Sequence, residues 1–329
     1  MRHHRAPSPA RRPRMTTRSS LTLPALLLTL TVACGLTACS SSSKMPAPPG
    51  SSGSAAGADS YQQVIDDAPV AAASDIPAGS LMAKIKARGT LNVGGTDAAA
   101  LFALKDPVSG KVTGFDAGLA DMLAKYIIGK PSTNRVQIDV TTREVLLQNG
   151  TVDSVLATYT ITPARAQKVG FAGPYYSSGD AILVKSSDTA ITKPSDLNGK
   201  SVCTETSSTA ANDIKQFAPS AKVVLFQTNA ECQQAVEQGR TDAYVLDQAL
   251  LLGDAARDKN VKVVGQPFTD EPYGIGVPLS SPEMKTFVDN WLKLIESDGE
   301  WARLWKATIG TELSGDAPTP PVVGSAAGS

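Results

Sequence analysis

The sequence predicts an α/β fold, because strand-like and helix-like segments alternate in two separate runs along the 329 residues. In the first run, a strand expected at 91–93 is followed by a helix capped by Asp116, a strand at 136–140 and a strand-turn-helix unit at 152–176. This order of elements is typical of a mostly parallel sheet covered by helices. We therefore expect the first run to form a lobe of its own.

The second run predicts a smaller α/β lobe. Its expected strands are 201–204, 223–226, 243–246 and 261–264, with helices between them. The segment that follows holds one strand-like stretch and a helix carrying Phe287 and Trp291, which is too little to form a domain alone. It most simply returns to the first lobe, so the chain would cross between the lobes twice and form a hinge.

The first 38 residues resemble a bacterial lipoprotein signal peptide. They contain six arginines and no acid, then an apolar stretch from Leu21 to Leu36, and they end in Leu-Thr-Ala before Cys39. In such signals the cysteine is acylated and becomes the new N-terminus. A membrane-spanning helix is the alternative, but the stretch is short of the ~20 residues that a bilayer requires and contains Pro24. We expect Cys39 to carry a lipid anchor.

Two low-complexity segments flank the expected lobes. Residues 39–80 consist mainly of Ser, Ala, Gly and Pro, which is the composition of a flexible tether. Residues 313–329 repeat this character, so a disordered tail is expected there. The first lobe would then comprise 81–180 and the return segment 269–312, and the second lobe 181–268.

Charge and histidine content exclude several classes of function. The chain has 31 basic and 31 acidic residues, and removal of the six arginines before Cys39 leaves 25 bases against 31 acids, a net charge of −6. Such a protein is a poor partner for nucleic acid or anionic lipid. Both histidines, His3 and His4, also precede Cys39, which removes Ser-His-Asp and Cys-His mechanisms and His-built metal sites. We expect no enzyme, no cofactor and no metal.

The unit at 152–176 predicts a receptor for a carboxylate. Thr158 and Thr160 lie two residues apart on an expected strand, and Thr162-Pro163 opens a helix. Arg165 falls in the first turn of that helix, where a cation opposes the helix dipole, so it is placed for something other than helix stability. Hydroxyls, free backbone N–H groups and a guanidinium together suit a carboxylate.

At this point the chain resembles the extracellular solute-binding proteins of the polar amino-acid ABC transporters, over about residues 81–312. Seven stretches carry the resemblance: Gly114-Phe115-Asp116, Val152-Asp153, the Thr-x-Thr-x-Thr-Pro-x-x-Arg unit at 158–165, the stretch from Phe171 to Tyr176, Asp242-Ala243 with Asp247, Pro272-Tyr273-Gly274-Ile275-Gly276, and Gly299-x-Trp301-x-x-Leu304-Trp305. The resemblance implies the two-lobed type II periplasmic-binding fold, the venus flytrap, with hinge crossings. Within that family the chain is most similar to actinobacterial glutamate-binding lipoproteins.

The resemblance also implies roles for particular residues. Arg165 would hold the ligand α-carboxylate beside Thr158 and Thr160, and Arg143 would bind an acidic side chain. Asp247 would pair with the α-ammonium, although an acid at that strand end could equally cap the next helix. When the lobes close, a turn of the second lobe would also reach the α-carboxylate. This turn consists of Ser207, Ser208 and Thr209. Roles without a ligand are also open: Arg143 could form an ion pair on the surface, and the turn could simply cap the helix that follows it.

Two aromatic residues and two cysteines complete the candidates. Phe102 and Tyr159 could form an apolar wall against the ligand, although aromatic residues of this kind are as often core. Cys203 and Cys232 are the cysteines left after Cys39 in an exported protein, one in a strand and one opening a helix of the same lobe. This favours a structural disulfide between them.

Together these inferences predict a monomeric receptor, lipid-anchored to the outer face of the cell membrane, that hands glutamate to the permease and ATPase subunits of an ABC importer. Glu205 and Asp180 add negative charge near the cleft, and one guanidinium can bind a carboxylate or an amide, so aspartate, glutamine and asparagine stay open. A cyclohexadienyl-dehydratase-like enzyme, with Glu205 as a general acid, is one alternative on the same fold. A ligand-sensing module of a membrane receptor is another.

Overall fold

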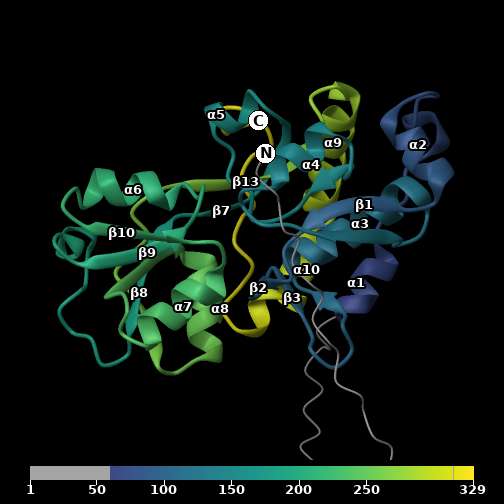
Figure 1. Ribbon diagram of the computed structural model, residues 1–329. Coiled ribbons are helices and arrows are strands. Elements are labelled where there is room, and N and C mark those ends of the chain that lie inside the picture. Colours follow the sequence, from purple (N-terminus) through teal and green to yellow (C-terminus); the bar gives the residue numbers. More distant parts are fainter. Residues whose placement is uncertain (1–59, 314) are drawn as a thin grey trace, which may run out of the picture. The chain divides into compact units, whose positions relative to one another are not determined.

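The computed structural model describes residues 60–313 and 315–329, all of which belong to the compact unit Ser54–Ser329 (Figure 1). The predicted signal peptide, the predicted lipidation site Cys39 and the predicted tether up to residue 59 lie outside the described residues. No helix within the described ranges is long and apolar enough to cross a membrane.

The described chain forms two five-stranded sheets, each covered by helices, which confirms the predicted two-lobed α/β fold (Figure 1). The first sheet has the order β5-β1-β6-β13-β7, with strands β1 Leu91–Gly95, β5 Thr133–Gln137, β6 Ser154–Val155, β7 Gly170–Ser178 and β13 Glu271–Val277. β1 pairs in parallel with β5 and β6, whereas β13 runs antiparallel to β6 and β7. We call this sheet and its helices the first lobe.

The second sheet has the order β10-β9-β11-β8-β12, with strands β8 Asp180–Lys185, β9 Ser201–Glu205, β10 Lys222–Phe226, β11 Ala243–Asp247 and β12 Val261–Val264. β9 pairs in parallel with β10 and β11, and β8 runs antiparallel to β11 and β12. This sheet and its helices form the second lobe. A small third sheet in the first lobe joins β2 Ala98–Ala99, β3 Ala103–Lys105 and β4 Val112–Thr113.

Helices cover both sheets. Those of the first lobe are α1 Tyr61–Asp67, α2 Leu81–Arg88, α3 Phe115–Ile128, α4 Arg143–Gln148, α5 Pro163–Ala166, α9 Pro282–Ser297 and α10 Glu300–Ala307, with 3-10 turns η1 Ala73–Asp75 and η3 Ile309–Thr311. Those of the second lobe are α6 Ala210–Phe217, α7 Asn229–Glu237 and α8 Gln248–Arg257, with the 3-10 turn η2 Pro194–Leu197.

The C-terminal helices pack on the first lobe, as the size of that segment predicts. Trp291 on α9 and Trp301 on α10 are fully buried, and the indole N–H of Trp301 donates to the backbone oxygen of Tyr175 (2.9 Å). The Trp301 ring meets the ring of Phe115 edge to face, at 5.3 Å between centroids. The return of the chain therefore completes the core of the first lobe.

The chain crosses between the sheets twice, at Gly179 and at 265–270. The backbone N–H of Asp180 donates to the hydroxyl of Thr269 (2.7 Å), and the backbone N–H of Phe268 donates to the backbone oxygen of Asp180 (2.9 Å). A Cβ at Gly179 would collide with the Thr269 backbone oxygen, so the close approach of the two crossings requires glycine there.

The ordered part extends further at both ends than the composition indicates. α1 lies in the segment expected to be a tether, and its Val64 and Ile65 are fully buried. In the segment expected to be a disordered tail, the Gly324 N–H donates to the Gly173 oxygen (2.8 Å) and Val323 packs on the main hydrophobic cluster. Composition alone does not predict this order, because a few apolar residues in these segments pack on the surface of the first lobe.

Cys203 and Cys232 are both buried and have free thiols in the structure. The thiol of Cys203 donates to the backbone oxygen of Cys232 (3.5 Å), so β9 and α7 hold the two residues side by side. The expected disulfide is not formed in the structure and stays a prediction.

Candidate functional site

A cavity of about 410 Å³ lies between the lobes, within the usual size of small-molecule sites. The first lobe lines it with residues 96–99 and 137–140, together with Thr142, Arg143, Ala157 and Thr158. The second lobe lines it with Glu205, residues 227–230 and Leu250. A ligand in this cavity would therefore touch both lobes.

Two buried arginines converge on the ring of Tyr159. The guanidinium carbon of Arg143, at the start of α4, lies 3.8 Å from the ring centroid, and that of Arg165, on α5, lies 5.4 Å from it. Arg143 is 4% exposed and Arg165 is 9% exposed, which excludes the surface roles that arginine usually has. Glu144, the neighbour with which Arg143 could have paired on the surface, binds Lys168 instead (2.8 Å).

The guanidinium groups of Arg143 and Arg165 donate few hydrogen bonds to other protein groups. Arg143 donates to the Ala157 backbone oxygen at a long 3.4 Å, and Arg165 donates to the backbone oxygens of Thr160 (2.8 Å) and Ser207 (3.1 Å). Neither arginine forms an ion pair with an acid of the described residues. Burial, helped by the nearby charge of Arg165, lowers the pKa of Arg143 to about 9, so it remains charged at neutral pH. Two adjacent buried cations of this kind form a receptor for an anion.

The second lobe places two carboxyl groups near the arginines. Asp247 ends β11, is 6% exposed and does not cap α8 with its side chain, and its Oδ1 has no hydrogen-bond partner in the structure. Glu205 ends β9 and lines the cavity directly. Burial raises the pKa of Asp247 to about 6 and that of Glu205 to about 7, while the arginine charges lower both. Either carboxylate can accept hydrogen bonds from an ammonium or amide group.

The hydroxyl-rich turn of the second lobe makes its contacts within the protein. Ser207 has a left-handed backbone (φ 67°), and its carbonyl is the acceptor for Arg165 across the cleft. The hydroxyl of Ser208 donates to the backbone oxygen of Glu205 (2.7 Å), and the hydroxyl of Thr209 donates to the carboxylate of Glu271 (3.0 Å). Thr209 is the residue before α6 but does not cap it with its side chain.

The structure brings most predicted residues to one place but separates one of them. Arg143 and Thr158 line the cavity, and Tyr159, Thr160 and Arg165 adjoin it through the contacts above.

Phe102 lies instead in the aromatic core of the first lobe. It is fully buried, and its ring contacts those of Phe115, Tyr176 and Tyr273. Phe102 does not line the cavity, so the structure favours the core position that was the alternative for it.

Asp116 holds Thr158 in an unusual backbone conformation. Thr158 has φ 43°, a left-handed value that is costly for a β-branched residue, and its N–H donates to Oδ2 of Asp116 (2.8 Å). Oδ1 of Asp116 accepts from the hydroxyl of Tyr175 (2.8 Å), and the carboxyl group is buried. The sequence marks Asp116 as a helix cap, but the structure makes it a positioning residue for the cavity wall.

We expect Asp116→Ala to lower the unfolding free energy by about 1–3 kcal/mol, because it leaves two buried donors without an acceptor. It should also weaken ligand binding about tenfold, since Thr158 would leave its strained conformation. Thermal unfolding and calorimetric titration measure the two effects. Tyr175→Phe is the control: it removes one of the two hydrogen bonds and should cost stability while leaving affinity within about twofold. Equal affinity loss in both variants would contradict the positioning role.

Comparison with known families decides the class of this protein. The family described as bacterial extracellular solute-binding proteins, family 3, matches residues 91–311. The chain belongs to this family. The match spans both lobes and includes both crossings between them.

Individual members are similar over most of the described chain. The ABC transporter glutamine-binding protein GlnH of Bacillus subtilis is 36% identical over 210 residues, which cover 64% of this chain and 77% of the relative. The glutamate-binding protein GluB of Corynebacterium glutamicum is 31% identical over 236 residues, covering 68% and 80%. Among solved structures, the ancestral amino acid-binding protein AncCDT-1, a precursor of cyclohexadienyl dehydratase, is 36% identical with a TM-score of 0.65, covering 70% of this chain and all of its own.

Family membership indicates the general function of the protein. A family 3 protein is an extracellular solute-binding protein, so the protein works outside the cytoplasm, and the cavity has a volume usual for a small-molecule site.

Proposed function

We propose that the protein is the lipid-anchored substrate-binding component of an ABC importer, which captures glutamate between its lobes and delivers it to the permease. The observation that carries the proposal is the pair of buried arginines against Tyr159, neither of which has an ion-pair partner in the described chain. Glutamate has two carboxylates, one for each guanidinium, and an ammonium that suits Asp247. The names of the Bacillus and Corynebacterium relatives support an amino acid as the ligand.

The ligand would bridge the lobes in this proposal. Arg165 and Thr160 of the first lobe would hold the α-carboxylate, next to the 207–209 turn of the second lobe, which Arg165 already contacts. Arg143 would bind the side-chain carboxylate in the cavity. The site is complete only when both lobes contribute, which is the condition a permease needs to distinguish loaded from empty protein.

Glutamine is a second candidate ligand, and a specific observation favours it. Glu205 lines the same cavity as Arg143, from the opposite lobe. An amide side chain would accept from Arg143 through its oxygen and donate to an ionised Glu205 through its nitrogen. A glutamate side chain would instead require Glu205 to be protonated, which its raised pKa of about 7 makes accessible near neutral pH.

Thermal unfolding of the Ser54–Ser329 unit with each of the twenty amino acids at millimolar concentration tests the proposal. A ligand at a thousand times its dissociation constant stabilises the folded state by about 4 kcal/mol, enough to raise Tm by several degrees. We expect the largest shifts with glutamate and with aspartate or glutamine, and recovery of the ligand unchanged. No shift with any amino acid, or conversion of a prephenate-like acid, would contradict the proposal and favour the dehydratase-like alternative.

A further inference from the structure

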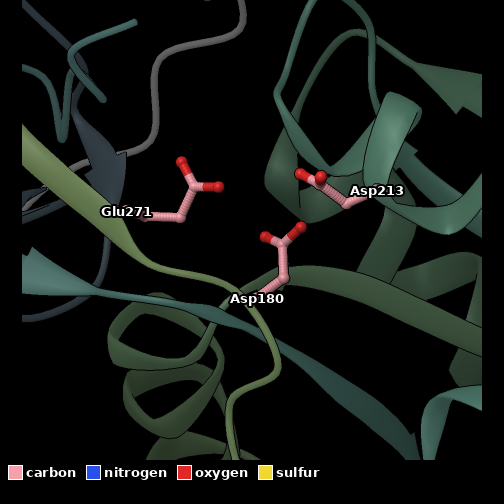
Figure 2. A group of neighbouring side chains, drawn as sticks. All are labelled: Asp180, Asp213 and Glu271. Carbon is pink, nitrogen blue, oxygen red and sulfur yellow. The ribbon is translucent and has the colours of Figure 1, made fainter. Parts of the chain in front are cut away.

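Three carboxyl groups from distant parts of the chain meet beside the hinge. They belong to Asp180, Asp213 and Glu271, and one oxygen of each lies within 4.8 Å of the others. Figure 2 shows the three side chains pointing into the space between them. Neither the predicted amino-acid site nor the cavity includes any of the three.

The cluster joins both crossings to the second lobe. Asp180 begins β8 after the first crossing, and Glu271 begins β13 after the second. Asp213 comes from α6, the helix that follows the 207–209 turn. Any ion shared by these carboxylates would therefore restrain the hinge.

The carboxyl group of Asp180 is placed like a metal ligand. Its side chain is fully buried, and neither of its carboxyl oxygens has a hydrogen-bond partner in the structure. Glu271, also buried, accepts from the hydroxyls of Thr209 (3.0 Å) and Thr269 (3.5 Å), and Asp213 is half-buried. A buried carboxylate is stable only with hydrogen bonds, a proton or a cation.

In the part of the chain that the structure describes, no basic side chain forms an ion pair with the cluster. None of the ion pairs found in the described ranges includes Asp180, Asp213 or Glu271. The charge of Glu271 acts to raise the pKa of Arg165, but that guanidinium already donates to two backbone oxygens, and Asp247 adds a further carboxyl group near Glu271. Carboxyl groups gathered in this way suit a bound positive ion.

We propose that Asp180, Asp213 and Glu271 bind one Ca²⁺ ion that ties the two crossings of the hinge to α6. Carboxylate oxygens are the ligands that Ca²⁺ prefers, at about 2.3–2.6 Å, so two oxygens on opposite sides of the ion lie about 5 Å apart. Separations of up to 4.8 Å fit this geometry. Mg²⁺ gives up its water reluctantly and usually keeps several water ligands, so it suits a buried cluster of protein carboxylates less well.

Calorimetric titration of the metal-free Ser54–Ser329 unit with CaCl₂, without any amino acid, tests this site. We expect one ion per protein and a rise in Tm of about 5 °C or more at millimolar Ca²⁺ relative to EDTA, with a smaller rise for MgCl₂. Because no amino acid is present, the result does not depend on the proposed function.

Matched variants show where the ion binds. Asp180→Asn should lose the Ca²⁺ response, and so should Asp213→Asn, a second variant at a more exposed position on a helix. Glu312→Gln changes an exposed acid elsewhere and should keep the response. Both Asn variants should fold without Ca²⁺ at least as well as the parent, since they relieve repulsion between like charges.

Three outcomes would overturn the proposal. They are the absence of a Ca²⁺-dependent shift in the parent protein, an equal shift in Asp180→Asn, and a Tm that responds to pH but not to Ca²⁺. The last result would assign the cluster to carboxyl groups that share protons.

Discussion

Arg165→Ala is expected to abolish binding of every amino acid to the Ser54–Ser329 unit. The α-carboxylate is common to all of them, and Arg165 is the buried guanidinium that connects the first lobe to the Ser207 carbonyl of the second. Removing one partner of a buried charge pair costs about 2–5 kcal/mol, which is roughly 30- to 4,000-fold in affinity. Isothermal titration with glutamate, glutamine and arginine measures the loss.

Two further variants separate this role from a general loss of structure. Arg165→Lys keeps the charge but not the planar fork, so it should retain weak binding. Arg240→Ala, on an exposed arginine of the second lobe, should bind as the parent does. Retention of glutamate binding within tenfold in Arg165→Ala, with an unchanged circular dichroism spectrum, would show that another group holds the α-carboxylate.

The elements that the sequence predicts well are those fixed by local chemistry. Thr162 caps α5 through its hydroxyl, which accepts from the Arg165 N–H (3.2 Å), and Pro163 occupies the first turn. The alternation of strands and helices likewise predicts the two sheets. The spacing of apolar residues and the turn residues that signal each element lie within a few positions of one another.

Register and local backbone conformation are predicted less well. The strand expected at 136–140 is β5, Thr133–Gln137, three residues earlier, which releases residues 138–140 to line the cavity. Thr158 is not part of a regular strand, because the buried carboxylate of Asp116 holds its backbone in a left-handed conformation. That contact joins positions 42 residues apart, and no short-range pattern encodes it.

The resemblance implies that Arg143, Tyr159 and Arg165 serve one site, but the residue pattern alone predicts neither their contacts nor the cluster at the hinge. Arg143 of α4 and Arg165 of α5 approach the same aromatic ring only in the folded chain. Asp180 was noted only as negative charge near the cleft, and its meeting with Asp213 and Glu271 depends on both crossings of the chain. Such clusters arise from tertiary packing, and the sequence signals only that buried acids need partners.

Arg143 and Glu205 are expected to set the preference between glutamate and glutamine. Arg143→Ala should weaken glutamate binding about 100-fold, close to 3 kcal/mol, because a buried side-chain carboxylate would lose its counter-charge. Glutamine should lose less, since its neutral amide needs no counter-charge and keeps the hydrogen bond to Glu205. Titration of both ligands into each variant measures the difference, with Arg240→Ala as the control. An equal loss for glutamate and glutamine would contradict the Arg143 assignment.

The sign of the pH dependence follows from Glu205. Burial raises its pKa to about 7, so between pH 8 and pH 6 the group changes from mostly ionised to mostly protonated, while the ligand carboxylate, with a pKa of about 4.3, stays ionised. Protonation removes repulsion from glutamate and an acceptor from glutamine. Between pH 8 and pH 7, where Asp247 with its pKa of about 6 stays mostly ionised, glutamate affinity should therefore rise as pH falls, and by no more than tenfold per pH unit, while glutamine affinity falls. In Glu205→Gln, glutamate should bind more tightly at pH 8 and lose this dependence; a pH profile unchanged from the parent would show that another group governs the preference.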